Sequence, residues 1–152
     1  MAVQFVFIIP LFVAFLAIVS DIGGAIWNVQ AMQSAVGASA RYLSRAPLDE
    51  DTANFTAAQI AQAQRLAVCG RVTATGGNGA CQAQYAWWTD LSSVSVTLSA
   101  VDEDIDTVFD EGFRVVTVTA NVQAQWRFLS IVGVDLTATT LSAEETTRYI
   151  GR

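Results

Sequence analysis

The side chains in this chain that could do chemistry are two cysteines, one cluster of carboxylates and one pair of tryptophans. Cys69 and Cys81 enclose a short Gly-rich loop, and this spacing favours a disulfide in an oxidising compartment over two unpaired buried thiols. The chain has no His, which excludes imidazole bases and the usual Ser-His and Cys-His nucleophile pairs. We therefore expect no catalytic residue, no metal site and no cofactor, and we predict that the protein is not an enzyme.

The carboxylates gather between Asp102 and Glu111. Alternating acids can bind Ca²⁺, because this ion prefers oxygen ligands. However, Thr107 stands where a calcium-binding loop of the EF-hand type needs Gly, and Glu111 comes two positions early. A solvated acidic hairpin loop is the favoured interpretation.

The tryptophan pair, Trp87 and Trp88, could form an aromatic platform for a ligand such as a carbohydrate. Adjacent aromatic residues are more often divided between the core and the surface. The ligand platform is therefore kept only as part of an alternative function.

The charge balance argues against nucleic acid as a partner. The formal net charge is −6, and all eight basic residues are Arg, with no Lys. Nucleic-acid affinity depends mainly on clustered basic side chains, so we expect no such partner.

The elements that position these residues begin with an apolar segment. No charged side chain occurs between Met1 and Val19. As a helix with a rise of about 1.5 Å per residue, this run spans ~28 Å, close to the hydrocarbon thickness of a bilayer. Such a segment must lie in lipid, in the core of an assembly, or in each at different times.

The helical pattern continues beyond this run. Apolar or small residues recur every three or four positions from Ile22 to Leu43, which predicts an amphipathic continuation. Small residues fill much of the remaining surface and would let copies of the helix approach closely. Pro47 is expected to end the helix, whereas Pro10 inside it predicts a kink or local melting. The amphipathic positions are Ile22, Ile26, Val29, Met32, Val36, Ser39 and Leu43, and the small residues are Gly23, Gly24, Ala25, Ala31, Ala35, Gly37, Ala38 and Ala40.

The order of these residues resembles the N-terminus of TadE-like pilins of the tight-adherence pilus. The similarity rests on Ala2-Val3-Gln4-Phe5, the apolar run with Pro10 and Leu11, and Asp21-Ile22-Gly23. The segments 115–120 and 135–139 also resemble the paired C-terminal strands of that family. The resemblance implies a pilin-like stalk that rests in the inner membrane and then packs with other copies, or other pilins, in an extracellular filament.

The resemblance also implies a set of assembly residues. Gln4 stands where the family has Glu, a side chain expected to pair with the free amine of a neighbouring subunit, and Gln cannot form that ion pair. A prepilin peptidase is implied as a processing partner, with Met1 either the processed N-terminus or preceded by further sequence. The expected assembly residues are Met1, Gln4, Phe5, Ile9, Pro10, Asp21 and Trp27.

The remaining sequence predicts a small α+β head. Residues 57–69 have helical spacing, with Thr56 as the N-cap. Alternation of period two predicts antiparallel strands over 94–99, 116–126 and from Val134 on, with a bulge near Thr140. The fold class is therefore α+β: an N-terminal helix over 1–46, and a head over 47–152 with a short helix, a small sheet and one disulfide.

An apolar segment lies between the second and third strands, where a polar turn would be normal. It is explained either by filling of the core or by a contact between subunits. Its residues are Phe128, Leu129, Ile131 and Val132.

The sequence thus favours a structural filament subunit whose precursor lies in the bacterial inner membrane, with its head in the periplasm or outside the cell. The alternative is a membrane-anchored periplasmic binding or assembly-adaptor module that does not polymerise.

Overall fold

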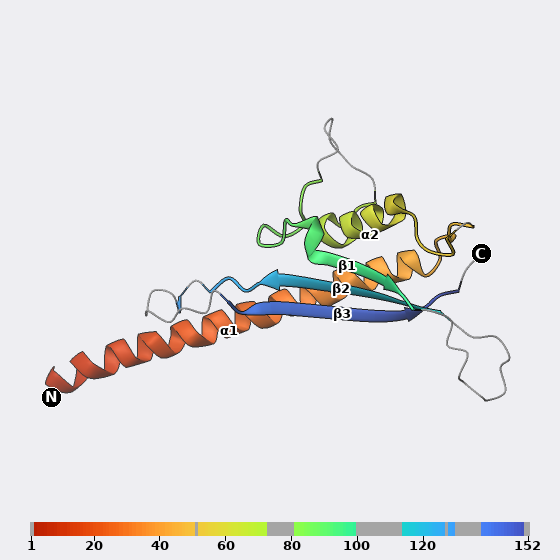
Figure 1. Ribbon diagram of the computed structural model, residues 1–152. Helices are drawn as coiled ribbons and strands as arrows, with labels where there is room; N and C mark the ends of the chain where they lie inside the picture. The colour runs from red at the N-terminus through yellow and green to blue at the C-terminus, as the bar shows by residue number, and fades with distance from the viewer. Residues whose placement is uncertain are drawn as a thin grey trace, which may run out of the picture.

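One helix, α1 (Ala2–Leu43), forms the axis of the molecule, and the other elements pack around its C-terminal half (Figure 1). The computed structural model describes residues 2–50, 52–72, 81–99, 114–126, 128–129 and 138–150, with side chains from residue 8 on. After α1 come α2 (Ala57–Cys69), a 3-10 turn η1 (Leu91–Ser93), and strands β1 (Val94–Leu98), β2 (Val115–Gln123) and β3 (Thr140–Arg148). The predicted α+β fold with one long and one short helix is confirmed.

Helix α1 is continuous over 42 residues, as the sequence predicts. The local melting that was one expectation at Pro10 does not occur, since the residues on both sides of it are helical. Proline removes only one backbone hydrogen bond of its own, and the many flanking turns maintain the helix. After Leu43 the chain turns tightly, with hydrogen bonds from Arg45 N to the Tyr42 carbonyl and from Ala46 N to the Leu43 carbonyl.

The face of α1 that meets the head is rotated from the predicted stripe. Met32, Val36 and Leu43 are fully buried as expected, but Ile22 and Ile26 are exposed. Nearer the N-terminus the covered face instead follows Asp21, which is buried, and Ala25 and Asn28, which are half-buried. Neighbouring positions differ by about 100° around a helix, so Ile22 and Ile26 point away from the head.

Helix α2 has well-defined ends. The Thr56 hydroxyl accepts a hydrogen bond from Gln59 N (3.3 Å), and the Gln59 side chain accepts one from Thr56 N (2.8 Å). This capping box confirms Thr56 as the N-cap. At the other end Gly70 is left-handed (φ 66°), a conformation that Gly adopts without steric strain.

The three strands form an antiparallel sheet in the order β1-β2-β3. The register of β2 and β3 is continuous from Val115 opposite Arg148 to Gln123 opposite Thr140, so the bulge predicted near Thr140 is wrong. Strand β3 begins at Thr140 and continues to Arg148. It includes Leu141 and Ala143, as expected for the third strand, and extends through the polar residues Glu144 to Arg148. The predicted strand residues 134–137 lie outside the described part of the chain.

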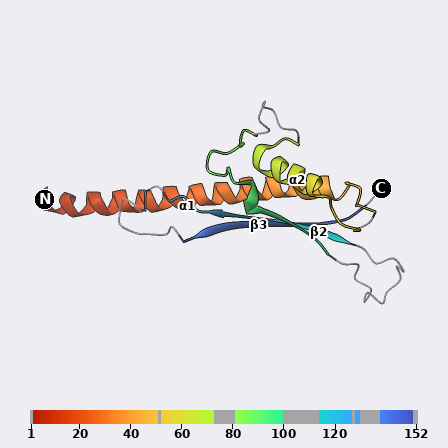
Figure 2. The ribbon, with the colours of Figure 1, turned by 45° about the horizontal axis from the view of Figure 1, so that its top comes forward.

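The core lies between the inner face of the sheet and the two helices. Val94, Val116, Val118 and Ala120 are buried on that face, and Ala63 and Ala67 of α2 complete the cluster. The Ser39 hydroxyl of α1 lies within hydrogen-bonding distance of the Ala63 carbonyl of α2 (3.0 Å). Both helices cover the same face of the sheet (Figure 2), and the second half of α1 is therefore part of the head's core.

The turn η1 supports this core from the side. The Asp90 carboxylate accepts hydrogen bonds from the Ser92 hydroxyl (2.7 Å) and backbone N (2.8 Å). These bonds hold the pKa of Asp90 below its ordinary value, the side-chain bond contributing most.

This division of α1 yields a matched pair of substitutions. Leu43 is fully buried, whereas Leu11 is the most exposed aliphatic side chain recorded on the same helix. Leu43→Ala should lower the free energy of unfolding by about 2–5 kcal/mol, because it leaves a cavity. Leu11→Ala should change it by less than about 0.5 kcal/mol. Urea unfolding of the detergent-solubilised chain, followed by near-UV circular dichroism, measures both; equal effects would contradict this assignment of the core.

Candidate functional site

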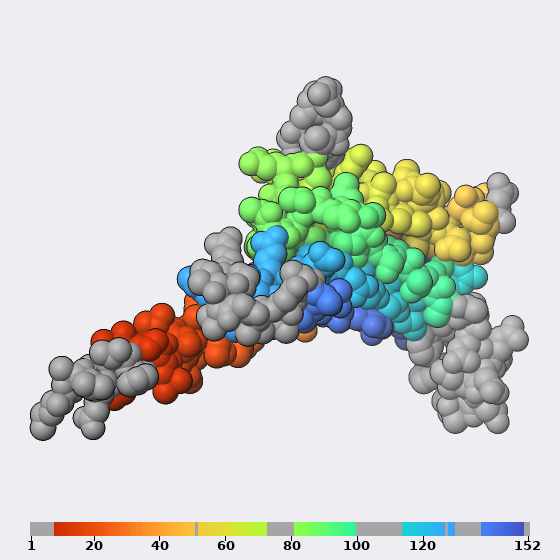
Figure 3. Space-filling model, turned by 60° about the vertical axis from the view of Figure 1, so that its left-hand side comes forward, coloured from red at the N-terminus to blue at the C-terminus, as the bar shows by residue number. Residues whose placement is uncertain are grey.

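The candidate functional site is the part of α1 that extends beyond the head. In Figure 3 this segment, coloured red, projects from the rest of the molecule. Its large side chains are exposed on every side of the helix, which distinguishes it from an amphipathic surface helix. They are Ile8, Ile9, Leu11, Phe12, Val13, Phe15, Leu16, Ile18, Val19, Ile22, Ile26 and Trp27.

The composition of this helix fits a bilayer. Among the described residues one helical stretch, Ile8–Leu43, is long and apolar enough to cross a membrane, with a mean hydropathy of 2.1 in its most apolar window. Only 6% of that window is buried within the protein. The segment is therefore unlike the core helix of a soluble domain, which is mostly covered.

The predicted assembly residues separate into two groups. Ile9 (59% exposed), Pro10 and Trp27 (70% exposed) lie on the open surface of α1. The backbone of Gln4 and Phe5 is part of α1, but their side chains are not among those described. Met1 lies outside the described residues altogether.

Asp21 differs from these residues because it faces its own head. It is only 8% exposed, and one carboxylate oxygen accepts hydrogen bonds from Phe128 N (3.0 Å) and Leu129 N (2.7 Å). Asp21 is the one charged side chain among the first forty residues. That isolation signalled a specific role, but the sequence alone did not reveal that its partners lie more than a hundred residues away.

The apolar segment after β2 is only partly described. Phe128 is 45% exposed, so filling of the core does not explain it, and Leu129 is half-buried. Ile131 and Val132 lie outside the described residues. Phe128 therefore adds an exposed aromatic ring beside Asp21, next to the projecting part of α1.

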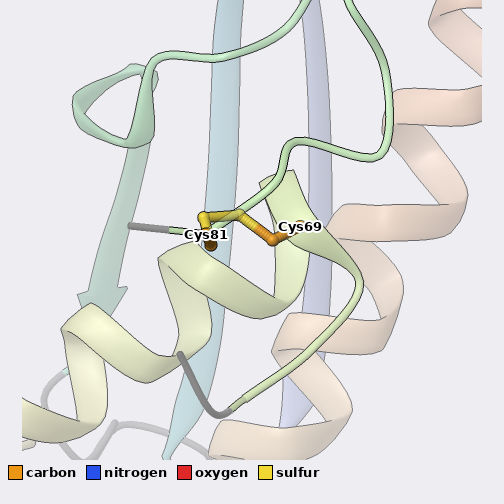
Figure 4. The surroundings of a disulfide bond; sticks show 2 residues. All are labelled: Cys69 and Cys81. Carbon is orange, nitrogen blue, oxygen red and sulfur yellow. A yellow bond between two sulfur atoms is a disulfide. The ribbon is translucent and has the colours of Figure 1, made fainter. Parts of the chain in front are cut away.

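The predicted disulfide between Cys69 and Cys81 is present (Figure 4). It joins the end of α2 to the segment that leads to β1. Gln84 N also donates to the Val68 carbonyl (2.8 Å). A hollow of about 410 Å³ beside the disulfide is lined by Gly70, Arg71 and Gln82–Gln84 together with the two cysteines.

The tryptophan pair is part of the fold rather than a ligand platform. Trp88 is buried, and its indole N–H donates to the Ser93 hydroxyl (2.7 Å). Trp87 is half-buried and stacks between Tyr85 (centroids 5.5 Å apart) and Trp88 (5.9 Å). A platform that uses both rings is therefore wrong, because Trp88 is not accessible to a ligand.

The acidic segment from Asp102 to Glu111 lies outside the described residues, and no statement about Ca²⁺ follows from the structure. Within the ranges that are described, no group of three or more Cys, Asp and Glu side chains is placed to hold a metal ion.

The comparison with known families concerns the helix just described. Residues 1–41 match the family model of TadE-like proteins. This segment is TadE-like. The match ends two residues before α1 does, so it covers the projecting helix and the part of α1 that the head encloses. No curated protein and no solved structure matches the chain.

The match confirms the resemblance read from the N-terminal residues. It is consistent with a pilus-associated protein, and the apolar TadE-like helix is consistent with anchoring in a membrane. The head beyond residue 41 carries no such match, and its role has to be argued from its contacts with this helix.

The contact of Asp21 gives a direct prediction for the TadE-like segment. Asp21→Ala removes an ionised acceptor, and a hydrogen bond to a charged group contributes about 1.5–3 kcal/mol. Amide hydrogen exchange at Phe128 and Leu129 should become at least tenfold faster, while exchange at Val118 in the centre of the sheet stays unchanged. Asp21→Asn retains a carbonyl acceptor and should have a smaller effect. Unchanged exchange at both amides in the Ala variant would contradict the contact.

The disulfide gives a second prediction. Cys69 and Cys81 are separated by 12 positions, and closing a loop of this size contributes ~3 kcal/mol in the chain-entropy description. Replacing both cysteines by Ser should lower the unfolding free energy by about that amount under non-reducing conditions. Addition of a reductant should destabilise the wild-type chain and leave the double variant unaffected.

Proposed function

We propose that this protein is a non-enzymatic structural subunit of an extracellular pilus-like filament, assembled through the N-terminal helices of neighbouring subunits. The observation that carries the proposal is the projecting half of α1, apolar on all sides and uncovered by its own head. Exposure of so much apolar surface to water is unfavourable, so the helix requires lipid or another protein around it. The TadE-like match supports a pilus as that environment.

The energetics favour packing between helices. Burying a Leu, Ile or Phe side chain contributes about 1.5–3 kcal/mol. The exposed side chains of α1 are numerous enough that their combined burial exceeds an association cost of about 4–15 kcal/mol. Gly23 and Gly24 add a flat strip, because among the described residues nothing lies within 4 Å of the position of an added Cβ. Small residues on an uncovered helix surface permit close approach of another helix.

The small residues further along α1 have a different role. Ala35 and Ala40 are buried against the head, and Gly37 lies under Glu145 of β3. Their packing is within the subunit. Contacts between copies therefore involve the helix before Met32, a shorter interface than the full run of small residues suggests.

In this proposal the same helix lies in the bacterial inner membrane before assembly. The head then faces the periplasm, an oxidising compartment in which the disulfide is stable. Copies of the subunit or other pilins are the assembly partners, and a prepilin peptidase is the processing partner implied by the family. The complete absence of His supports a structural rather than a catalytic role.

A pair of Ile substitutions tests assembly. Ile9 projects from α1 (59% exposed), and Ile150 is 72% exposed at the opposite end of the head. Ile9→Asp places an unpaired carboxylate in the helix interface, where burial of a charge is strongly unfavourable. It should abolish filaments seen by electron microscopy and leave the near-UV spectrum of the head unchanged, whereas Ile150→Asp should leave filaments intact.

Normal filaments from the Ile9→Asp variant would refute the proposal. If the wild-type chain stays membrane-bound and monomeric when expressed with its own secretion system, the non-polymerising adaptor replaces the filament subunit. Membrane fractionation of each variant separates a failure of insertion from a failure of assembly.

A further inference from the structure

We propose that the turn at Phe128–Leu129 rests on the bilayer surface and forms a second membrane contact beside the TadE-like helix, with Asp21 fixing its depth. This inference rests on the membrane-embedded state of α1 in the proposed function and goes beyond the helix itself. It assigns a partner to an exposed apolar part of the head, namely the boundary between lipid headgroups and acyl chains.

The length of α1 sets the level of Asp21. From Ala2 to Asp21 the helix rises about 28 Å at 1.5 Å per residue, and the hydrocarbon core of a bilayer is about 30 Å thick. When this uncharged stretch fills the hydrocarbon core, Asp21, the first charged residue after it, lies at the membrane face next to the head. Since Phe128 N lies 3.0 Å from the Asp21 carboxylate, the turn occupies the same level.

The hydrogen bonds explain how a carboxylate is tolerated at this boundary. A charged group near hydrocarbon is strongly unfavourable unless polar groups surround it. Two backbone N–H groups of the turn donate to the same oxygen of Asp21, and the side chain is shielded from solvent. The turn therefore stabilises the carboxylate of the helix, and that carboxylate fixes the position of the turn.

The exposed side chains at this level suit an interface. Phe128 presents an exposed aromatic ring beside Asp21. Trp27, also exposed, lies about 9 Å beyond Asp21 along α1 at 1.5 Å per residue. Side chains on a helix lean toward its N-terminus, which brings the Trp27 indole back toward the headgroup layer. Trp is enriched where membranes meet water, because its ring is apolar and its N–H is polar.

Continuity with the projecting helix favours lipid over another protein as the occupant. Exposed apolar residues of α1 stand on both sides of Asp21 in the sequence, and the exposed Phe128 is held to that same residue by a backbone hydrogen bond. Ile150 is more exposed than Phe128, but its N–H donates to the Ser44 carbonyl (3.0 Å), just beyond the C-terminal end of α1 and away from Asp21. This residue provides a matched apolar position that a membrane at the level of Asp21 does not reach.

The test uses the full chain, uniformly labelled with ¹⁵N, at one copy per nanodisc of phosphatidylglycerol and phosphatidylcholine. Lipids carrying a spin label near the headgroup broaden nearby amide signals. We expect the amide signals of Phe128 and Leu129 to lose at least two thirds of their intensity, as should that of Ile22, while Ile150 keeps its full intensity. In Asp21→Ala the loss at Phe128 should fall by at least half with Ile22 unchanged, whereas Asp21→Asn should stay closer to wild type.

Full intensity at Phe128 together with broadening at Ile22 would overturn the membrane contact of the turn but leave the filament proposal standing. The turn would then be available for a contact between subunits. Absence of broadening along α1 itself would overturn both the insertion of the helix and this inference. A filament defect in Ile9→Asp is measured separately and does not enter this test.

Discussion

The structure depends on one constraint, the need of a long apolar helix to stay out of water when its own domain covers only about half of it. The head encloses α1 from Met32 to Leu43, where Val36 and Leu43 reach full burial. The sheet and α2 pack on that half alone, through β2, β3 and the face of α2 that carries Ala63 and Ala67. Before Met32 the head covers only one face of the helix, at Asp21, Ala25 and Asn28, and the large apolar side chains from Ile8 to Trp27 stay exposed. In the proposed function these side chains are covered by lipid or by other subunits.

Asp21 marks the transition between these two halves. A lone carboxylate in forty otherwise uncharged residues would weaken the membrane segment if it projected into lipid. In the structure it is turned toward the head and accepts two backbone hydrogen bonds. The charge that ends the apolar run thus also attaches the turn after β2 to the helix, and the fold uses one residue to limit the anchor and to close the head around it.

The sequence allowed the elements to be predicted better than their mutual arrangement. Helix α2 was predicted from Ala57 to Cys69 with Thr56 as its cap, because caps and periodicity are local signals. The disulfide followed from two cysteines around one loop. The third strand was predicted from Val134 through Leu141 and Ala143, which overlaps β3, but its extension to Arg148 was not. Residues Glu144 to Arg148 have no apolar alternation, and their pairing with Val115–Thr119 is a long-range property.

The same difference between local signals and long-range contacts applies to the candidate site. Exposure of Ile9 on α1 agrees with its place in the uncharged run, which the sequence assigns to lipid or to the core of an assembly. The partner of Asp21 could not be inferred from the sequence. Its donors are backbone N–H groups, which nearly every residue has, so the side chains of Phe128 and Leu129 do not indicate the bond. That bond nevertheless changes the interpretation of the resemblance: an acid placed among the assembly residues has an intramolecular partner. In the proposed filament Asp21 would therefore act on assembly indirectly, because it holds the head at a fixed level along the helix.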